Sequence, residues 1–496
     1  MNLMYQSTRD QKMKVTASQA ILQGLSPDGG LFVPEFIPVL TKTPAELSAL
    51  DYRELAFELL KLFLTDYTED ELKNCIAGAY DDKFDTPEIA PLVKVGQAYY
   101  LELFHGATIA FKDMALSILP HLLKTAASKN NVRDEIVILT ATSGDTGKAA
   151  LAGFAGVEGT KIIVFYPKDG VNPVQEKQMV TQKGSNTSVI GVIGNFDDTQ
   201  TGVKAIFNNK ELEDRMRKSG FRFSSANSIN IGRLLPQIVY YFYSYVTLYK
   251  KECIADGDKV NFVVPTGNFG NILAAYYAKQ MGLPVNKLIC ASNENKVLFD
   301  FFQSGVYDRN RQFFLTTSPS MDILISSNLE RLIYHIAGND ATKTAELMQA
   351  LSSKGRYEIT AGMGNNLKDF IGGYADMEET NTAIHKTYKE NGYVADTHTG
   401  VAAAVYDEYV KNTGDSTKTI IISTASPYKF ARSVLKAVGF SDIPQDDYEQ
   451  AKLLQAVSGV KIPTAMEEIH NAPILHKMMC DIDKIQAAVE DILKII

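Results

Sequence analysis

From about residue 96 onward, short runs of apolar residues alternate with longer stretches in which apolar residues recur every three or four positions. The run at 136–139 is continuously apolar, as in a strand whose two faces are both buried, and 161–166 predicts the next strand. Further strands are predicted at 98–103, 188–192, 260–264, 287–291 and 419–422. Helices are predicted between them at 114–127, 148–156, 174–182, 197–209 and 271–281. Strands that alternate with helices in this way predict an α/β fold with parallel sheets.

The two ends of the chain have different patterns. Before residue 96, the turn cluster 24–30 leads into a short strand that Pro34 ends. Leucines at helical spacing then predict one helix over 46–64, and Thr68, which three acids follow, predicts the start of the next helix. From about residue 446, apolar residues at three-and-four spacing predict helices that pack against the body of the protein.

Composition narrows the classes of protein that fit this pattern. The 496 residues allow two or three domains, and the net charge of −8 includes no basic block that would bind nucleic acid. No apolar run approaches the roughly eighteen residues of a membrane span, and the first residues lack the apolar run of a secretory signal. The four cysteines have no CxxC spacing and predict reduced thiols, so we expect a cytoplasmic protein. The tyrosine-rich stretch 240–249 is typical of a buried helix face.

Lys112 has the most suggestive position of any lysine in the sequence. The strand predicted at 98–103 and the helix predicted at 114–127 place it at a strand-to-helix junction, next to Ala110 and Phe111 rather than next to other charges. Apolar surroundings disfavour the ammonium form and leave a free amine that can act as a nucleophile. The alternative is a lysine that extends its ammonium into water near a helix start, and this stretch alone leaves both interpretations open.

Two glycine-rich turns follow predicted strands and each leads into a predicted helix. The first, 140–147, presents free backbone N–H groups at a helix N-terminus and suits a carboxylate. It is not a Walker A loop, because its spacing differs and Ala149 follows Lys148 where Ser or Thr is required. The second, 265–271, has successive amides that suit a phosphate and lacks the GxGxxG spacing of a dinucleotide site. For either turn, an ordinary strand-to-helix connection is the alternative.

A third stretch, 423–427, ends the late strand and places the hydroxyl of Thr424 at the edge where ligands bind in parallel sheets. A Ser/Thr turn or a helix cap is the alternative. The histidines His385 and His398 form no metal-binding pattern, and His105 is interpreted as structural, so no metal site is expected. A reactive lysine, a carboxylate-binding turn and a phosphate-binding turn together are what a pyridoxal-phosphate enzyme acting on an amino acid requires.

Taken in chain order, the motifs resemble those of the threonine synthase family, whose members are pyridoxal-phosphate enzymes of the tryptophan-synthase-β-like fold type II. The similarity is to the long branch of this family, found in yeast and many bacteria, and it extends over nearly the whole chain. The segments that carry it are 24–31, 104–113, 142–147, 195–198, 227–230, 265–271, 318–322 and 423–427.

The resemblance implies a role for each motif. It implies that Lys112 forms the Schiff base with pyridoxal 5'-phosphate and that Thr424 faces the pyridine nitrogen of the cofactor. The residues implied to hold the cofactor phosphate are Gly267, Asn268, Phe269, Gly270 and Asn271. The residues implied to receive the substrate carboxylate are Thr142, Ser143, Asp145 and Thr146. Two positions depart from the family pattern: Ala107 replaces a usual proline and is expected to loosen the turn before Lys112, and Tyr428 replaces a small residue and is expected to alter the pocket.

The resemblance also implies a domain organisation. It implies fold type II architecture, with two parallel-sheet α/β domains, an additional N-terminal region and C-terminal helices. We expect a family-specific N-terminal region at 1–95 and a large cofactor-binding domain built from 96–130 and 226–445. A small mobile domain at 131–225 is expected to close over the substrate. A helical segment at 446–496 is expected to complete the chain.

The implied activity is that of a lyase that converts O-phospho-L-homoserine and water to L-threonine and phosphate, the last step of threonine synthesis. Residues expected to hold the substrate phosphate are Lys177, Asn227, Ser228 and Arg233. Other possibilities are a serine or threonine dehydratase with the same cofactor, or a phosphometabolite-binding protein without catalysis. We expect a small-molecule substrate, no nucleic-acid or membrane partner, and a monomer.

Overall fold

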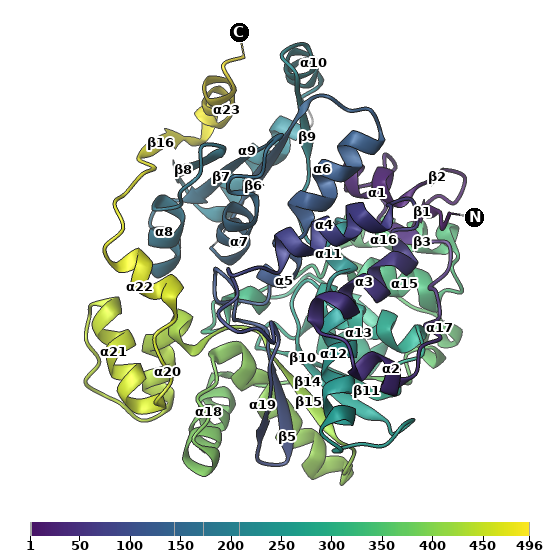
Figure 1. The fold of residues 1–496 in the computed structure, drawn as a ribbon, viewed down its shortest axis with the longest axis vertical. Coiled ribbons are helices and arrows are strands. Elements are labelled where there is room, and N and C mark those ends of the chain that lie inside the picture. The colour runs from purple at the N-terminus through teal and green to yellow at the C-terminus, as the bar shows by residue number, and fades with distance from the viewer. Residues whose placement is uncertain (1, 143, 172, 208, 496) are drawn as a thin grey trace.

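The computed structural model describes residues 2–142, 144–171, 173–207 and 209–495, and within these ranges two sheets organise the molecule (Figure 1). The larger sheet has six strands in the order β14-β11-β10-β15-β5-β4. Neighbouring strands are parallel, except that β4 runs antiparallel to β5. The strands are β4 (Leu92–Val95), β5 (Ala98–Glu102), β10 (Val260–Pro265), β11 (Val285–Ser292), β14 (Phe370–Tyr374) and β15 (Thr419–Ser423). The predicted α/β fold with parallel sheets is therefore confirmed.

The smaller sheet has five parallel strands in the order β16-β8-β7-β6-β9. They are β6 (Glu135–Ala141), β7 (Thr160–Pro167), β8 (Thr187–Ile193), β9 (Phe221–Ser224) and β16 (Met478–Asp481). The edge strand β16 comes from the end of the chain, so the segment 446–496 contains a strand in addition to the predicted helices (Figure 1). A four-residue edge strand is too short to show a periodic pattern, and its pairing with β8 is a tertiary contact.

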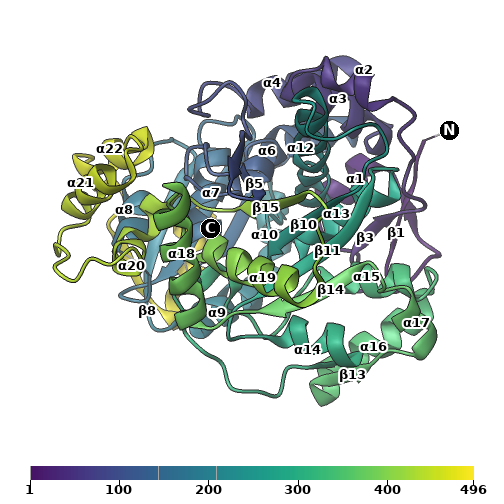
Figure 2. The ribbon, with the colours of Figure 1, turned by 90° about the horizontal axis from the view of Figure 1, so that it is seen from below.

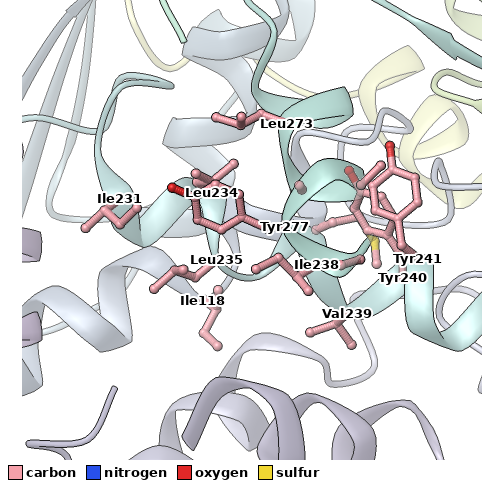
Figure 3. Packing of buried hydrophobic residues seen from close by; sticks show 14 of the residues in the cluster. Ile118, Ile231, Leu234, Leu235, Ile238, Val239, Tyr240, Tyr241, Leu273 and Tyr277 are labelled. Carbon is pink, nitrogen blue, oxygen red and sulfur yellow. The ribbon is translucent and has the colours of Figure 1, made fainter. Parts of the chain in front are cut away.

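Helices cover both faces of the larger sheet because its strands are apolar on both sides. One face packs on α19 (Thr397–Thr413), with Val263 and Ile421 contacting Val401 and Val405 in one cluster. The other face packs on α12 (Gln237–Lys250) and α13 (Gly270–Gln280) in the main core (Figure 2). Tyr240 and Tyr241 of α12 are fully buried there, which confirms the prediction of a buried tyrosine-rich helix face (Figure 3).

The smaller sheet is covered in the same way. Its strands pack on one side against α9 (Phe196–Phe207) and α23 (Ile485–Leu493), with Val489 fully buried among them. On the other side they pack against α7 (Asp145–Phe154), which belongs to the main core. The C-terminal helix is therefore part of the layer that covers the smaller sheet.

Two predicted helices are each divided in two. The stretch 46–64 forms α2 (Pro44–Ser48) and α3 (Tyr52–Phe63), because Asp51 makes a reciprocal capping box with Glu54 and starts a new helix. The stretch 114–127 forms α5 (Asp113–Leu116) and α6 (Leu119–Lys129), with Pro120 in the first turn of α6. Proline has no N–H to continue a preceding helix but suits a first turn.

The N-terminal region forms a three-stranded antiparallel sheet that lies against the larger domain. Its strands are β1 (Tyr5–Ser7), β2 (Lys14–Val15) and β3 (Phe32–Pro34), in the order β2-β1-β3. Arg9 forms two hydrogen bonds with Glu330 of α15 (Leu329–Ile336), which attaches this sheet to the body of the protein. Strand β4, at the end of the region predicted as 1–95, pairs instead with the larger sheet.

Further helices and strands complete the described structure. The remaining α-helices that begin before residue 300 are α1 (Ala17–Gln23), α4 (Glu69–Ala79), α8 (Pro173–Val180), α10 (Lys210–Lys218), α11 (Ile231–Leu234) and α14 (Val297–Ser304). Those that follow are α16 (Ala341–Lys354), α17 (Ala361–Asn365), α18 (Met377–Asn391), α20 (Ala431–Ala437), α21 (Asp447–Ser458) and α22 (Thr464–His470). Strands β12 (Val306–Asp308) and β13 (Arg356–Glu358) form a separate two-stranded antiparallel sheet.

Candidate active site

Lys112 lies where β5 has ended and α5 begins, as the sequence predicts. The loop before it is attached to the end of β15 by two backbone hydrogen bonds. The N–H of Phe111 donates to the carbonyl of Thr424 (2.8 Å), and the N–H of Ser426 donates to the carbonyl of Ile109 (3.0 Å). These bonds place Lys112 and Thr424 at the carboxyl ends of neighbouring parallel strands, where ligands bind in sheets of this kind.

Two residues near this edge have left-handed backbone conformations that are unusual for their type. Ile109, three positions before Lys112, has φ of +53°, and Phe269, at the start of α13, has φ of +67°. Such conformations cost about 1 to 3 kcal/mol and persist only where the surroundings impose them. Ile109 is fully buried in an apolar cluster, and the ring of Phe269 stacks with Phe302 and Phe370. The fold therefore holds both loops in defined, strained shapes.

Thr108 is the fixed corner of the loop that carries Lys112. Its N–H and its hydroxyl both donate to the carboxylate of Asp113, at 2.8 and 2.6 Å. Its carbonyl accepts a hydrogen bond from the ammonium of Lys429 (2.9 Å). Thr108, Asp113 and Lys429 are all buried, so three polar groups of one residue are held by charged side chains inside the protein. These bonds hold the residue that follows Ala107 in place, and the effect of alanine in place of proline stays a prediction.

Asp145, the first residue of α7, connects segments that are distant in sequence. Its Oδ2 accepts a hydrogen bond from Ser320 Oγ (2.9 Å) and lies 3.5 Å from Lys112 Nζ. Its Oδ1 accepts from Gln175 Nε2 (2.6 Å) and lies 2.8 Å from Lys429 Nζ. Lys112 Nζ in turn donates to Ser320 Oγ (3.1 Å). One carboxylate from the smaller sheet's first helix therefore meets two lysines and a serine of the larger domain.

The charges around Lys112 shift its protonation. Burial lowers the pKa of Lys112, the carboxylate of Asp145 opposes this shift, and the charges of Lys429 and Arg233 lower the pKa further. Burial by itself raises the pKa of Asp145, but the ammonium groups of Lys429 and Lys112 hold it well below its usual value. The expected direction for Lys112 is confirmed, but the expectation that it lies away from other charges is wrong, because the fold brings distant charges beside it.

The turn 140–147 is organised by Thr142, whose buried hydroxyl accepts hydrogen bonds from the N–H groups of Gly144 (3.0 Å) and Gly147 (2.9 Å). Position 147 has no room for a side chain, because a Cβ there would lie 2.3 Å from the Thr142 methyl group. Thr146 is half-buried beside Asp145, and Ser143 lies outside the described residues. The structure thus brings Thr142, Asp145 and Thr146 to one helix N-terminus.

The stretch from Gly267 to Asn271 leads into α13 and includes its first two residues, and the first N–H groups of a helix have no partners within it. Two backbone carbonyls of this stretch accept hydrogen bonds: that of Gly267 from Ser326 Oγ (2.6 Å) and that of Asn268 from the N–H of Asn328 (3.0 Å). The side chain of Asn271 is buried, and its Nδ2 has no partner among the described residues. Unused donors at a helix N-terminus suit a phosphate, so this loop fits the phosphate of pyridoxal 5'-phosphate.

Arg233 and the turn before it form a second anion-compatible region. Arg233 is buried, its Nη1 donates to the carbonyl of Ala226 (3.0 Å), and its Nε has no partner in the described part of the chain. Burial lowers the pKa of Arg233 to about 10, so the guanidinium remains charged at neutral pH. Asn227 is exposed and Ser228 half-buried on the turn that the N–H of Asn230 closes by donating to the carbonyl of Asn227 (3.0 Å).

Two residues that were predicted to lie near the substrate, Lys177 and Tyr428, form hydrogen bonds with the C-terminal segment. The ammonium of Lys177 on α8 donates to the carbonyl of His470 in α22 (2.8 Å), so it contacts the C-terminal segment. The hydroxyl of Tyr428 donates to the carbonyl of Val460, and its ring belongs to a cluster with Ile462. The hydroxyl of Tyr428 therefore contacts the C-terminal segment, and its effect on the pocket stays a prediction.

Sequence patterns missed several side chains of this site. Lys429 lies between the aromatic residues Tyr428 and Phe430. Apolar neighbours are the signal that draws attention to Lys112, so the same signal is present for Lys429. Ser320 lies in a motif that suggested no role. His398 accepts a hydrogen bond from the N–H of Ser320 at Nε2 (3.2 Å), while its Nδ1 lies 2.7 Å from Asp396. His398 is thus a support of the Ser320 backbone.

Comparisons with known proteins agree with this geometry. A family model described as "Pyridoxal-phosphate dependent enzyme" matches residues 85–425, so the chain is a member of that class of enzymes. Models described as "Threonine synthase N terminus" and "Threonine synthase, C-terminal" match residues 4–80 and 399–489. The chain is 37% identical over 470 residues to threonine synthase of Saccharomyces cerevisiae, covering 88% of this chain and 90% of that protein. Within the class, the chain belongs to the threonine synthase family.

Further relatives extend this result. The chain is 39% identical over 462 residues to human threonine synthase-like 1, and the match covers 90% of this chain but 61% of that longer protein. Among solved structures, yeast threonine synthase has a TM-score of 0.89 at 34% identity, and the match covers 99% of both chains. The pyridoxal-phosphate-bound threonine synthase of Brucella melitensis has a TM-score of 0.85 at 33% identity, again covering 99% of both. Fold type II architecture and pyridoxal phosphate as the cofactor follow. No helix in the described ranges is long and apolar enough to cross a membrane.

Proposed function

We propose that this protein converts O-phospho-L-homoserine and water to L-threonine and phosphate. The observation that carries the proposal is the position of Lys112, a largely enclosed amine with a lowered pKa that lies between a phosphate-compatible loop, a helix N-terminus and a buried guanidinium. The names of the yeast and Pseudomonas aeruginosa relatives support the same activity.

The cofactor is assigned to three segments. We propose that Lys112 bonds covalently to the cofactor, that Gly267 to Asn271 bind its phosphate and that Thr424 contacts its pyridine nitrogen. The hydrogen bond from Phe111 N–H to the Thr424 carbonyl supports the placement of the last residue beside the first. The unpartnered Nδ2 of Asn271 supports the phosphate loop. When bound, pyridoxal phosphate supplies the ring that holds the negative charge left after a proton is removed from the α carbon of the substrate.

The substrate is assigned to two further segments. We propose that the turn containing Thr142, Ser143, Asp145 and Thr146 receives the carboxylate, and that Arg233 with Asn227 and Ser228 receives the substrate phosphate. The charge balance supports an anionic ligand, because the buried cations Lys148, Arg233 and Lys429 join Lys112, while Asp113 and Asp145 are the nearby buried acids. Lys177 remains a prediction as a phosphate ligand, and its present partner is the His470 carbonyl.

Lys112 is the group that moves protons in this proposal. When not bonded to the cofactor, the free amine of Lys112 would stand within reach of the α and β carbons of the substrate. Ser320 Oγ lies 3.1 Å from Lys112 Nζ and 2.9 Å from the Asp145 carboxylate, so it orients the amine and links it to an anion that stabilises its protonated form. In the net reaction, the α and β carbons each give up a proton and phosphate leaves from the γ carbon. The γ and α carbons then each take up a proton, water adds its hydroxyl group to the β carbon, and the remaining proton leaves with phosphate.

The domain organisation remains part of the proposal. We propose that the smaller sheet, with residues 131–225 and the C-terminal β16 and α23, moves as a unit and closes over the substrate against the larger domain of 96–130 and 226–445. The contacts of Asp145 with Lys112, Ser320 and Lys429 support a closing face at this position. We also propose a monomer that works in the cytoplasm, which is consistent with four free cysteines. Light scattering of the purified protein tests the monomer.

The test of the proposed function is an assay with O-phosphohomoserine in which phosphate and threonine are both measured. We expect equal amounts of the two products, and a loss of about a thousand-fold or more in rate for Lys112→Ala. Borohydride reduction followed by peptide mass spectrometry is expected to locate the cofactor on Lys112. Keto acid formed from serine or threonine, without phosphate release from O-phosphohomoserine, would instead identify a dehydratase. Absence of any turnover by the cofactor-loaded protein would indicate a binding protein.

A further inference from the structure

Arg331 in α15 is a guanidinium without exposed surface whose hydrogen-bond acceptors among the described residues are all neutral. Its Nε donates to the carbonyl of Phe32 (2.9 Å), its Nη1 to Asn328 Oδ1, and its Nη2 to the carbonyl of Ile229 (2.6 Å). Burial lowers the pKa of Arg331 to about 10, so it remains charged at neutral pH. A buried charge without a carboxylate partner is costly to the folded state, which raises the question of what this residue holds in place.

The first segment that Arg331 reaches is the loop assigned to the cofactor phosphate. Asn328, which accepts from Arg331, uses its own N–H and its Nδ2 to bind the carbonyl of Asn268, at 3.0 and 3.1 Å. The Asn328 side chain has no exposed surface and therefore has one fixed orientation. Its amide oxygen faces Arg331, so its Nδ2 is directed at the loop. Arg331 thereby orients the amide that supports the loop 267–271 from behind.

The second segment is the turn assigned to the substrate phosphate. The bond from Arg331 Nη2 ends on Ile229, which lies inside the turn 227–230. The same turn is held from the other side by the N-terminal region, because Asn230 Nδ2 donates to the carbonyl of Ile21 (3.0 Å). The third bond of Arg331 also ends in the N-terminal region, at Phe32 of β3. The family-specific N-terminal region and Arg331 therefore hold this turn together.

We propose that Arg331 is a positioning residue that sets the distance between the loop that binds the cofactor phosphate and the turn that binds the substrate phosphate, using the N-terminal region as its third support. The planar guanidinium is suited to this role because its donors point in fixed, divergent directions and can reach three acceptors at once. A lysine ammonium at this position cannot span the three segments. This inference rests on the proposed function, since it takes the roles of both phosphate-binding segments from it.

The test compares Arg331→Met and Arg331→Lys with Arg9→Met. Arg9 is a matched control because it binds Glu330, the neighbour of Arg331, through Nε (2.8 Å) and Nη2 (2.7 Å) and joins the same two parts of the protein without contacting either phosphate-binding segment. Pyridoxal phosphate is titrated into each apoprotein by absorbance, and KM and kcat are measured with O-phosphohomoserine. For both Arg331 variants we expect about a ten-fold weaker cofactor affinity and about a ten-fold higher KM, with a smaller change in kcat. Arg9→Met is expected to retain both wild-type values.

A cofactor-free measurement keeps the proposal testable if a variant is unstable. In the apoprotein, hydrogen exchange at the amides of 227–230 and of 267–271 is expected to accelerate together in Arg331→Lys, and in Asn328→Ala at 267–271 alone. If both Arg331 variants lose thermal stability as Arg9→Met does but keep wild-type cofactor affinity, KM and exchange, the residue is only structural and the proposal fails. A change at one segment without the other also overturns it. Wild-type protein that produces no threonine from O-phosphohomoserine contradicts the proposed function, whereas active wild type with unaffected Arg331 variants contradicts only this inference.

Discussion

At the scale of single residues, the electrostatics around Lys112 depend on Lys429. The ammonium of Lys429 has no exposed surface, lies 2.8 Å from Asp145 Oδ1 and donates to the carbonyl of Thr108. It therefore neutralises the carboxylate that otherwise stabilises the protonated form of Lys112, and its own charge also disfavours that form. The buried Lys429 thus helps to lower the pKa of Lys112.

Lys429→Met is expected to raise the pKa of Lys112. The Asp145 carboxylate would then no longer be neutralised by Lys429, and one positive charge that repels the Lys112 ammonium would be lost. The measurement is the pH dependence of acetylation of Lys112 in the apoprotein, followed by peptide mass spectrometry, and the expected shift of its midpoint is about one pH unit upward. Lys436→Met, on the exposed side of α20, is the control and should leave the midpoint unchanged. A midpoint that moves downward or stays in place for Lys429→Met contradicts this account.

Gly267 and Gly270 allow a second comparison between single residues. A Cβ at Gly267 would lie 2.5 Å from the backbone oxygen of Ser320, whereas a Cβ at Gly270 would meet no atom closer than Asn328 Nδ2 at 3.5 Å. Gly267→Ala is therefore expected to displace Ser320 and to weaken cofactor affinity by about ten-fold or more, with a much smaller effect for Gly270→Ala. Titration of pyridoxal phosphate into the two apoproteins measures the difference. Equal losses in both variants would mean that crowding of the cofactor, rather than of Ser320, limits this loop.

At the scale of elements, the end of β5 is held by His105, which connects the strand to the preceding loop. His105 Nδ1 lies 2.6 Å from Asp85 and its Nε2 lies 3.0 Å from Glu102, the last residue of β5. Burial by itself lowers the pKa of His105, but the hydrogen bonds and charges of the two carboxylates raise it to about 9. The sequence-based interpretation of His105 as structural agrees with these contacts.

The raised pKa of His105 predicts how stability changes with pH. A histidine that binds its proton more tightly in the folded state contributes stability in full below its unfolded pKa of about 6.5, and loses it as pH rises through about 9. We expect His105→Gln to be less stable than wild type by about 1 to 2 kcal/mol at pH 6, since Asp85 is partly screened by water, and the difference to vanish near pH 10. Urea unfolding at several pH values measures it. A difference that grows with pH is incompatible with this assignment.

At the scale of the whole molecule, the C-terminal segment connects the two sheets. Its first part, α21 and α22, packs in a cluster with α20 and Tyr428 beside the larger domain. Its last part adds β16 to the edge of the smaller sheet and packs α23 against α9, as Figure 1 shows along one side of the molecule. Leu475 and His476 attach the stretch between them to α8, by donating to the Val180 carbonyl at 2.8 and 3.0 Å. The segment is therefore structural for both domains.

Val489→Ala tests the contribution of the last helix to the smaller sheet. Val489 is fully buried in the cluster that covers this sheet, so the substitution leaves a small cavity and is expected to cost about 1 to 2 kcal/mol. Hydrogen exchange should accelerate in β8 and β16 more than in β10 and β15. Lys484→Ala, at an exposed position just before α23, is the control. Uniform acceleration over both sheets would show that the two sheets unfold as one cooperative unit.

Closure of the smaller sheet over the substrate is expected to order the turn that contains Thr142 and Thr146, and hydrogen exchange in this turn tests it. If this turn receives the substrate carboxylate, a substrate analogue should slow hydrogen exchange at 142–147 in the cofactor-loaded protein, because its amides become hydrogen-bonded and shielded. Asp145→Asn weakens the contacts with Lys112 and Lys429 and is expected to reduce the slowing. Equal exchange with and without the analogue, in wild type, argues against closure at this turn.

Local patterns were sufficient for the elements and for the main loops of the site. The buried strands β6, β7, β8, β10, β11 and β15, the helix start at Thr68 and the position of Lys112 all follow from short-range periodicity and capping, which act within a few residues. The breaks at Asp51 and before Pro120 were missed although their capping signals are local, because the apolar stripe continues across both of them.

What only the tertiary structure decided is which distant groups meet. Asp145 and Lys429 are 284 positions apart in the sequence yet form an ion pair at 2.8 Å, and Arg331 joins Phe32 to Ile229 across the chain. The edge strand β16 exists only because β8 offers a partner. Sequence by itself determined most of the elements, the strand-to-helix junction at which Lys112 lies and the family, since these depend on neighbouring residues and on motif order. The charges that tune Lys112 depend on packing, because an electrostatic interaction depends on distance in space and on burial rather than on separation along the chain.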